Sequence, residues 1–380
     1  MYKPVFSLLA ITFLSCSSED NKIESLLEDK NPLIETVYEN KEKHNLQILY
    51  TQIKRDSLGD PFFVEHSYNV EDNVYFYPAS TMKLPIVALT LQKLNELRNT
   101  GLNINVESKI LLIKEDEIFQ ETTFKDLIAK VFLVSDNSAS NILINFLGYN
   151  YFNQQMRSKG LKTIVLNHKF NPDPYVKTDW RIHTLERDLI SKNETQEVIE
   201  HNNLDNLHQG KSKILNGEKI DTPFNFKTKN RASLGDLDGV MKRIIYPELF
   251  EEKDKMNLRD QDYNFLRYWL SRFTFEDVGA EYQKDSIYYD SYNKFFIYGD
   301  STNTIDRQIR IYNKVGVAYG ALTDISYIRD YQKDIEFFLS ATIYVNQNQI
   351  VNDNIYEYDD VGIPFLAELA RQVYKLEEQY

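Results

Sequence analysis

Strand-like segments stand at both ends of this 380-residue chain, and a helical stretch lies between them. Two runs rich in β-branched and aromatic residues come early, at 46–53 and 61–68, and three come late, at 305–317, 322–331 and 337–345. Strands this far apart in the chain can share one sheet. We therefore predict an α+β fold, with one antiparallel sheet built from both chain ends, flanking helices and an all-helical lobe beside it.

Apolar residues at helical spacing fill the middle of the chain and its end. Leu84, Val87, Ala88, Leu91 and Leu94 form one stripe, which predicts a helix that begins near Met82. Similar patterns predict helices over residues 31–42, 123–147 and 361–376.

The charge balance excludes one class of partner. The chain has 57 acidic and 44 basic residues and a formal net charge of -13, so no basic surface is available to neutralise phosphates, and we expect no nucleic acid. Its six histidines lie scattered without ligand spacing, so we expect no metal and no cofactor. His201 and His208 stand in a polar stretch and are interpreted as residues of a solvated loop.

The N-terminus has the pattern of an export signal. Residues 1–15 carry Lys3 followed by a short apolar run, and Cys16, the single cysteine of the chain, comes directly after it. This resembles a bacterial lipoprotein signal, in which the cysteine carries lipid. The alternative is a plain secretory signal with an incidental cysteine. We expect a signal peptide at 1–15, a polar tether at 16–32 and one domain at 33–380, anchored to the periplasmic or cell-surface face of a membrane.

Two stretches of the expected domain look inserted. Residues 186–228 are polar, and residues 246–298 are strongly aromatic. Aromatic side chains can stack on sugars, but they more often fill a core, and we favour the core interpretation here.

Three short motifs carry the chemistry. They stand in the order Ser80-Thr81-Met82-Lys83, Ser135-Asp136-Asn137 and Lys314-Val315-Gly316. Residues i and i+3 share a helix face, so Ser80 and Lys83 would be neighbours. The lysine amine could remove the serine proton only if its pKa were lowered by burial or by a second cation.

Each motif also has a plain structural interpretation. The Ser135-Asp136-Asn137 motif precedes an expected helix and, alone, is typical of a helix cap. Lys314, alone, would be a solvated lysine near the end of a strand. A second Ser-x-x-Lys match, Ser291-Tyr292-Asn293-Lys294, lacks a following apolar stripe and comes after Ser135-Asp136-Asn137, so we set it aside.

Together and in this order, the motifs resemble those of the class A β-lactamase-like family of penicillin-recognising serine enzymes. The resemblance covers about residues 46–376. It implies the following roles: Ser80 as nucleophile, Lys83 as base, Ser135 as proton relay, Asn137 as the anchor of a substrate amide, Lys314 as the anchor of a substrate carboxylate, Gly316 as the point where substrate approaches the strand, and the N–H groups of Ser80 and Val317 as oxyanion donors.

Two departures from the family pattern concern the substrate and its release. Val315 stands where the family usually has Thr or Ser, whose hydroxyl helps to bind the β-lactam carboxylate. The Glu-Pro loop that supplies the deacylation base in class A enzymes is missing, and Asn171-Pro172-Asp173-Pro174 occupies its place. Asp173 is a possible shorter substitute for the base, or a plain loop aspartate.

The resemblance implies a serine hydrolase with an acyl-enzyme mechanism, with β-lactam hydrolysis as the first hypothesis. A cell-wall peptidase or another amide or ester serine hydrolase is the second. A membrane-tethered binding protein without turnover is the third. The expected partners are a small β-lactam or cell-wall peptide and, through the lipid, a membrane.

Overall fold

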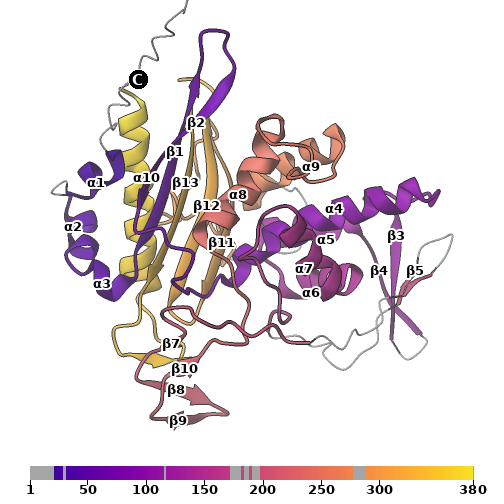
Figure 1. Ribbon diagram of the computed structural model, residues 1–380, viewed down its shortest axis with the longest axis horizontal. Coiled ribbons are helices and arrows are strands. Elements are labelled where there is room, and N and C mark those ends of the chain that lie inside the picture. The colour runs from indigo at the N-terminus through magenta and orange to yellow at the C-terminus, as the bar shows by residue number, and fades with distance from the viewer. Residues whose placement is uncertain are drawn as a thin grey trace, which may run out of the picture.

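A five-stranded antiparallel sheet forms the centre of the computed structural model, in the order β11-β12-β13-β1-β2. The structure describes residues 21–28, 31–114, 117–171, 181–183, 188–190, 197–276 and 287–379. The strands are β1 (Gln47–Arg55), β2 (Pro61–Tyr68), β11 (Ile309–Ala318), β12 (Ala321–Asp330) and β13 (Ile335–Tyr344). The first strand pairs with β13, so both chain ends build one sheet and the predicted α+β fold is confirmed (Figure 1).

Helices cover both faces of this sheet, which explains why β12 is buried along nearly its whole length. One face packs against α10 (Ile363–Glu377) together with α1 (Lys22–Leu27), α2 (Pro32–Tyr38) and α3 (Lys41–His44). The other face packs against α8 (Leu234–Ile245). Neighbouring residues alternate between the two cores: Phe337 belongs to the first and Phe338 to the second.

The helical lobe lies on the α8 side of the sheet (Figure 1). It contains α4 (Lys83–Asn99), α5 (Phe124–Leu133), α6 (Asn137–Leu147), α7 (Tyr149–Ser158) and, beside α8, α9 (Asp260–Leu270). Every residue of α4 from Lys83 to Gln92 is buried, so this part of the helix is enclosed on all sides and not only along the predicted stripe.

Short elements complete the structure. The remaining strands are β3 (Lys109–Lys114), β4 (Glu117–Thr123), β5 (Arg181–His183), β6 (Asp188–Ile190), β7 (His208–Gln209), β8 (Ser212–Leu215), β9 (Glu218–Ile220), β10 (Phe224–Asn225) and β14 (Ile350–Val351). Single helical turns are η1 (Ala79–Met82), η2 (Pro247–Leu249), η3 (Thr274–Glu276) and the π-helical η5 (Tyr358–Gly362). Strands β3 to β6 form a separate sheet at the end of the helical lobe.

Two predictions near the N-terminus are wrong. The tether expected over residues 16–32 includes α1, whose Ile23 and Leu27 are fully buried in the sheet core. Its polar composition concealed one apolar pair at i and i+4, enough to dock a short helix. The single helix expected over 31–42 is broken at Glu39 and Asn40 into α2 and α3.

The polar segment before α8 folds against the sheet end. Its strand β8 pairs in parallel with β14, and Phe226 is fully buried. His208 is exposed as expected, but the solvated-loop interpretation is wrong for His201, which is buried at 3% exposure and bonded to the carbonyl of Lys229.

The core interpretation of the aromatic stretch is confirmed for its buried members, which are Tyr263, Trp269, Phe273, Phe295 and Phe296. Tyr268 is exposed. Across the described ranges, no helix has the length and apolar character that crossing a membrane would require.

Candidate active site

Ser80 lies in η1, the tight turn that leads directly into α4. The hydroxyl and the N–H of Thr81 both donate to the carbonyl of Pro78, at 2.6 and 3.1 Å, and these two bonds hold the turn. Ala79 has a φ of +45°, a left-handed conformation that is costly for a residue with a Cβ. The chain therefore holds Ser80 in a constrained turn at the start of a buried helix.

Lys83 is buried and faces the second motif. Its Nζ donates to the carbonyl oxygen of Ser135 and to Asn137 Oδ1 at 2.7 Å, and it lies 3.3 Å from Ser135 Oγ. Burial, helped by the nearby Lys314 cation, lowers the Lys83 pKa well below its usual value. The structure thus meets the condition under which this amine can act as a base.

Ser135 lies between two lysines. It occupies the corner between α5 and α6 with a φ of +55°, and Asp136 caps α6 by accepting from the N–H of Ala139 at 2.6 Å. The helix-cap interpretation of the motif is therefore confirmed for Asp136. The Ser135 hydroxyl is 2.9 Å from Lys314 Nζ as well as 3.3 Å from Lys83 Nζ.

Lys314 is buried on the edge strand β11, so its interpretation as a solvated lysine is wrong. Its Nζ donates to Ser135 Oγ and, at 3.0 Å, to the carbonyl of Val315. Burial lowers the Lys314 pKa to about 7, although the nearby Asp324 carboxylate raises it.

A buried polar network lies behind Lys314, and the sequence motifs do not indicate it. Asn313 donates to both oxygens of Asp324, at 2.9 and 3.1 Å, and accepts from Lys294 Nζ at 2.7 Å. The lysine also donates to the carbonyls of Leu270 and Ile311. Lys294, from the Ser-x-x-Lys match that we set aside, thus stabilises β11 through hydrogen bonds to two of its residues. The only signal in the sequence was the position of Asn313 next to Lys314.

Gly316 allows the turn that contains Ser80 to pack on β11. A Cβ at this position would lie 2.5 Å from the Pro78 carbonyl oxygen and 3.1 Å from the Ser80 nitrogen. The sequence predicted that this glycine makes room for substrate. In this structure it makes room for η1.

The N–H of Val317 faces the outer edge of the sheet, beyond β11. Tyr319 and Gly320, with φ of +55° and +87°, form a two-residue hairpin turn between Ala318 and Ala321. The two residues that flank such a turn, Ala318 and Ala321, form a hydrogen-bonded pair. Along an antiparallel strand the hydrogen-bonded positions alternate, so Val317, one residue before Ala318, directs its N–H away from β12. That edge is the one on which η1 packs.

A cavity of about 410 Å³ opens in front of these groups, and Ser80, Asn137 and Val317 line it. Both polar atoms of the Asn137 side chain are hydrogen-bonded, because its Oδ1 accepts from Lys83 Nζ and its Nδ2 donates to the carbonyl of Asn171, each at 2.7 Å. The Ser80 hydroxyl has no hydrogen-bond partner within the described part of the chain.

Two predicted site residues, Cys16 and Asp173, lie outside the described residues. Among the described residues, no group of three or more His, Cys, Asp or Glu side chains is arranged to hold a metal ion.

A serine at the start of a buried helix, with a buried lysine of lowered pKa and a lysine-bound second serine, defines a serine hydrolase that works through an acyl-enzyme. The chain belongs to the β-lactamase enzyme family, whose sequence profile matches residues 34–262. No curated protein sequence matches the chain.

Solved structures of the same fold agree with this assignment. The extended-spectrum β-lactamase TLA-3 is 15% identical, with a TM-score of 0.54 and coverage of 94% of this chain and 97% of that one. A PBP-A variant, solved as an acyl-enzyme with penicillin G, is also 15% identical, with a TM-score of 0.54 and coverage of 95% and 97%. A β-lactamase from Sphaerobacter thermophilus is 13% identical, with a TM-score of 0.50 and coverage of 94% and 97%. At these identities the likeness is one of fold.

Proposed function

We propose that this protein hydrolyses β-lactams through an acyl-enzyme formed on Ser80. The observation that carries the proposal is the Ser135 hydroxyl, which lies within 3.3 Å of the Lys83 amine and 2.9 Å from that of Lys314. This arrangement gives protons a short path between the base that activates the nucleophile and the nitrogen that must leave.

In the first step, the neutral Lys83 amine takes the proton of Ser80, and Ser80 Oγ bonds to the lactam carbonyl carbon. The N–H groups of Ser80 and Val317 stabilise the oxyanion that forms. The carbon–nitrogen bond then breaks, and the leaving nitrogen takes a proton from Ser135 Oγ. Lys83 returns its proton to Ser135, so the relay ends this step in its starting state.

In the second step, water replaces Ser80 on the acyl carbon and releases the acid. This step needs a base that removes a proton from the water and returns it to Ser80 Oγ as the acyl bond breaks, and we propose Asp173 for that role. Replacement of Asp173 by Asn should then leave acylation unchanged and slow deacylation.

A cell-wall peptidase or another amide or ester hydrolase is the second candidate. Val315 favours it, because position 315 offers no hydroxyl to a β-lactam carboxylate. The proton path through Lys83 and Ser135 would serve an amide or ester in the same way.

Labelling by a fluorescent penicillin and by a fluorophosphonate tests the serine hydrolase. We expect the wild type to be labelled and Ser80→Ala to be unlabelled. Ser291→Ala is the matched control, since Ser291 opens the other Ser-x-x-Lys segment. It should keep full labelling and lose only about 1 kcal/mol of stability, from its hydrogen bond to the Ser301 carbonyl.

The outcomes separate the candidates. Turnover of nitrocefin by the wild type supports the β-lactamase. Labelling by fluorophosphonate without nitrocefin turnover supports the peptidase or esterase. If neither reagent labels the folded wild type, the protein is a binding protein on the same fold and the proposal is overturned.

We also propose that the protein is exported and lipid-anchored through Cys16. The support is the apolar run of residues 1–15 followed by the single cysteine of the chain. Metabolic labelling with palmitate should mark the wild type and not Cys16→Ala. Equal labelling of both would contradict the anchor.

A further inference from the structure

The cavity in front of Ser80 has the opposite charge from the protein as a whole. The chain carries a formal net charge of -13. The described residues that line the cavity include Lys169 and Lys229 but no Asp or Glu. A cavity with this lining attracts an anionic group and repels a cationic one.

Lys229 is held firmly at this cavity by the segment before α8. Its carbonyl accepts from His201 Nε2 at 2.7 Å and from Asn167 Nδ2 at 3.2 Å, and its N–H donates to the carbonyl of Phe226 at 2.9 Å. With its backbone bonded on both sides, the lysine is positioned before any ligand arrives.

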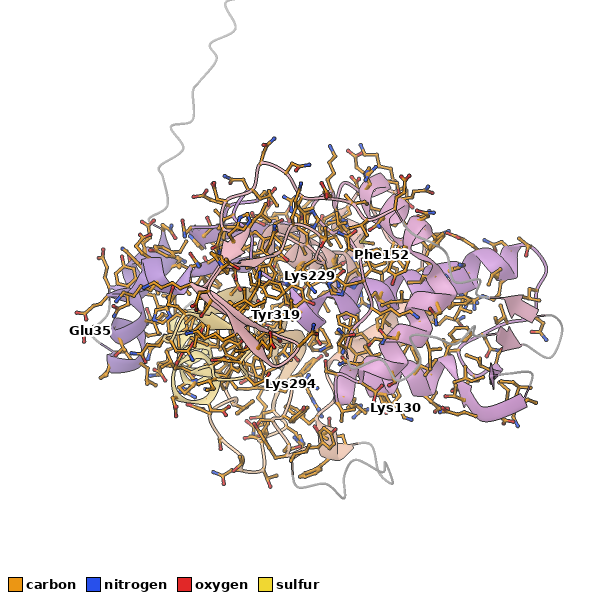
Figure 2. The ribbon with its side chains drawn as sticks, turned by 90° about the horizontal axis from the view of Figure 1, so that it is seen from below. Glu35, Lys130, Phe152, Lys229, Lys294 and Tyr319 are labelled. Atoms are coloured by element: carbon orange, nitrogen blue, oxygen red, sulfur yellow. The ribbon has the colours of Figure 1, made fainter. Side chains whose placement is uncertain are left out.

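The ammonium group of Lys229 rests on aromatic rings. Its Nζ lies 5.6 Å from the ring centre of Phe224 and 6.0 Å from that of Tyr319, and the two rings pack at 5.2 Å. Figure 2 shows Lys229 next to Tyr319. Within the described residues, no carboxylate pairs with Lys229, while its neighbour Lys227 pairs with Glu200 at 2.7 Å. Lys229 is therefore a partly buried cation that still lacks an anion.

His168, also at the cavity wall, adds no charge. Its Nδ1–H donates to the carbonyl of Lys169 at 2.7 Å, and its Nε2 accepts from the N–H of Asn230 at 3.2 Å. Both ring nitrogens are satisfied in the neutral form, and burial lowers the His168 pKa to about 4. The positive charge of the lining thus comes from its lysines.

We propose that Lys229 binds an anionic group of the substrate, a carboxylate, while Ser80 attacks the substrate's carbonyl. This inference rests on the proposed serine hydrolase. It adds a residue of the segment before α8 to the recognition of the acid group, in a chain whose Val315 offers no hydroxyl for that purpose. The preferred substrates are then acyl compounds that carry a carboxylate which can enter this cavity together with the bond to be broken.

The test compares benzylpenicillin with its methyl ester, which lacks the carboxylate. We measure the second-order rate constant of acylation for the wild type, Lys229→Met and Lys229→Arg. Lys227→Met is the matched control, because Lys227 lies two residues away in the same segment and does not line the cavity.

For benzylpenicillin, Lys229→Met should lower the acylation rate constant by about ten- to a hundredfold, the effect of one charge-assisted contact. Lys229→Arg should restore most of it, and Lys227→Met should match the wild type. For the methyl ester, all four proteins should react alike.

Two failures are distinguishable. If the wild type is acylated and Lys229→Met reacts with benzylpenicillin as fast as the wild type, the role of Lys229 is refuted and the serine hydrolase stands. The role of Lys229 is also refuted, and the serine hydrolase also stands, if Lys229→Met lowers the acylation rate constants of benzylpenicillin and of its methyl ester by the same factor. That result would show a structural effect of the substitution and not the loss of a contact with the carboxylate. If the wild type reacts with neither penicillin nor fluorophosphonate, the proposed function itself fails.

Discussion

Replacement of Gly316 by Ala should displace Ser80, the proposed nucleophile, without changing its side chain. The new Cβ would lie 2.5 Å from the Pro78 carbonyl oxygen, 3.0 Å from the Thr81 nitrogen and 3.1 Å from the Ser80 nitrogen. An ordinary carbon contact needs about 3.5 Å, so β11 and η1 must separate by about 1 Å. All three neighbours are backbone atoms, which cannot rotate away as a side chain would.

The displacement should affect stability and reactivity together. Overpacking of this kind costs about 1–3 kcal/mol. A shift of about 1 Å in a reacting group costs about a hundredfold in rate. We therefore expect Gly316→Ala to unfold at lower urea concentration and to be acylated by a fluorescent penicillin about a hundredfold more slowly than the wild type.

Gly235→Ala is the matched control. It lies in α8, where an added Cβ would meet nothing within 4 Å. Its acylation rate should equal the wild-type rate, and its stability should be unchanged or higher by up to about 1 kcal/mol. A wild-type acylation rate in folded Gly316→Ala would refute the conclusion that β11 positions the turn of Ser80.

Two further predictions concern buried ionisable groups. The pKa of His168 is lowered from 6.5 to about 4 by burial, so the unfolded state binds more protons between these values and stability falls as pH falls through them. His168 should account for about 2 kcal/mol of the free energy of unfolding that the wild type loses between pH 7 and pH 5. Urea unfolding should therefore show a loss smaller by about 2 kcal/mol in His168→Gln, and an equal loss in both proteins would contradict this prediction. Lys294→Met leaves three buried oxygen acceptors without their donor and should cost about 3–5 kcal/mol, whereas exposed Lys130→Met should stay within about 0.5 kcal/mol. A loss below about 1 kcal/mol for Lys294→Met in the same urea assay would show that the network does not brace β11.

Local patterns predicted most of the fold. β-Branched and aromatic content placed all five sheet strands within a few residues of their bounds, for example β2 at Pro61–Tyr68. The failures lie where a short segment depends on its neighbours. Residues 22–27 look like a tether until Ile23 and Leu27 are seen to enter the sheet core.

The motifs predicted which residues meet, but not how they meet. Ser135 and Lys314 are 179 positions apart in the chain and 2.9 Å apart in space, as their shared family pattern suggested. The same pattern gave no reason to notice Lys294 or Asp324, because their contacts with Asn313 depend on the packing of β11 and not on spacing along the chain.

The sequence by itself determined the elements, the order of the three motifs and the class of chemistry, since these depend on residue type and spacing. Only the tertiary structure decided the states of the groups that would do the chemistry. The Lys83 pKa is lowered because folding removes the amine from water and brings Lys314 near it. Lys229 meets the cavity of Ser80 because a distant segment folds against the end of the sheet. Burial and long-range proximity are properties of the folded chain, and no local pattern contains them.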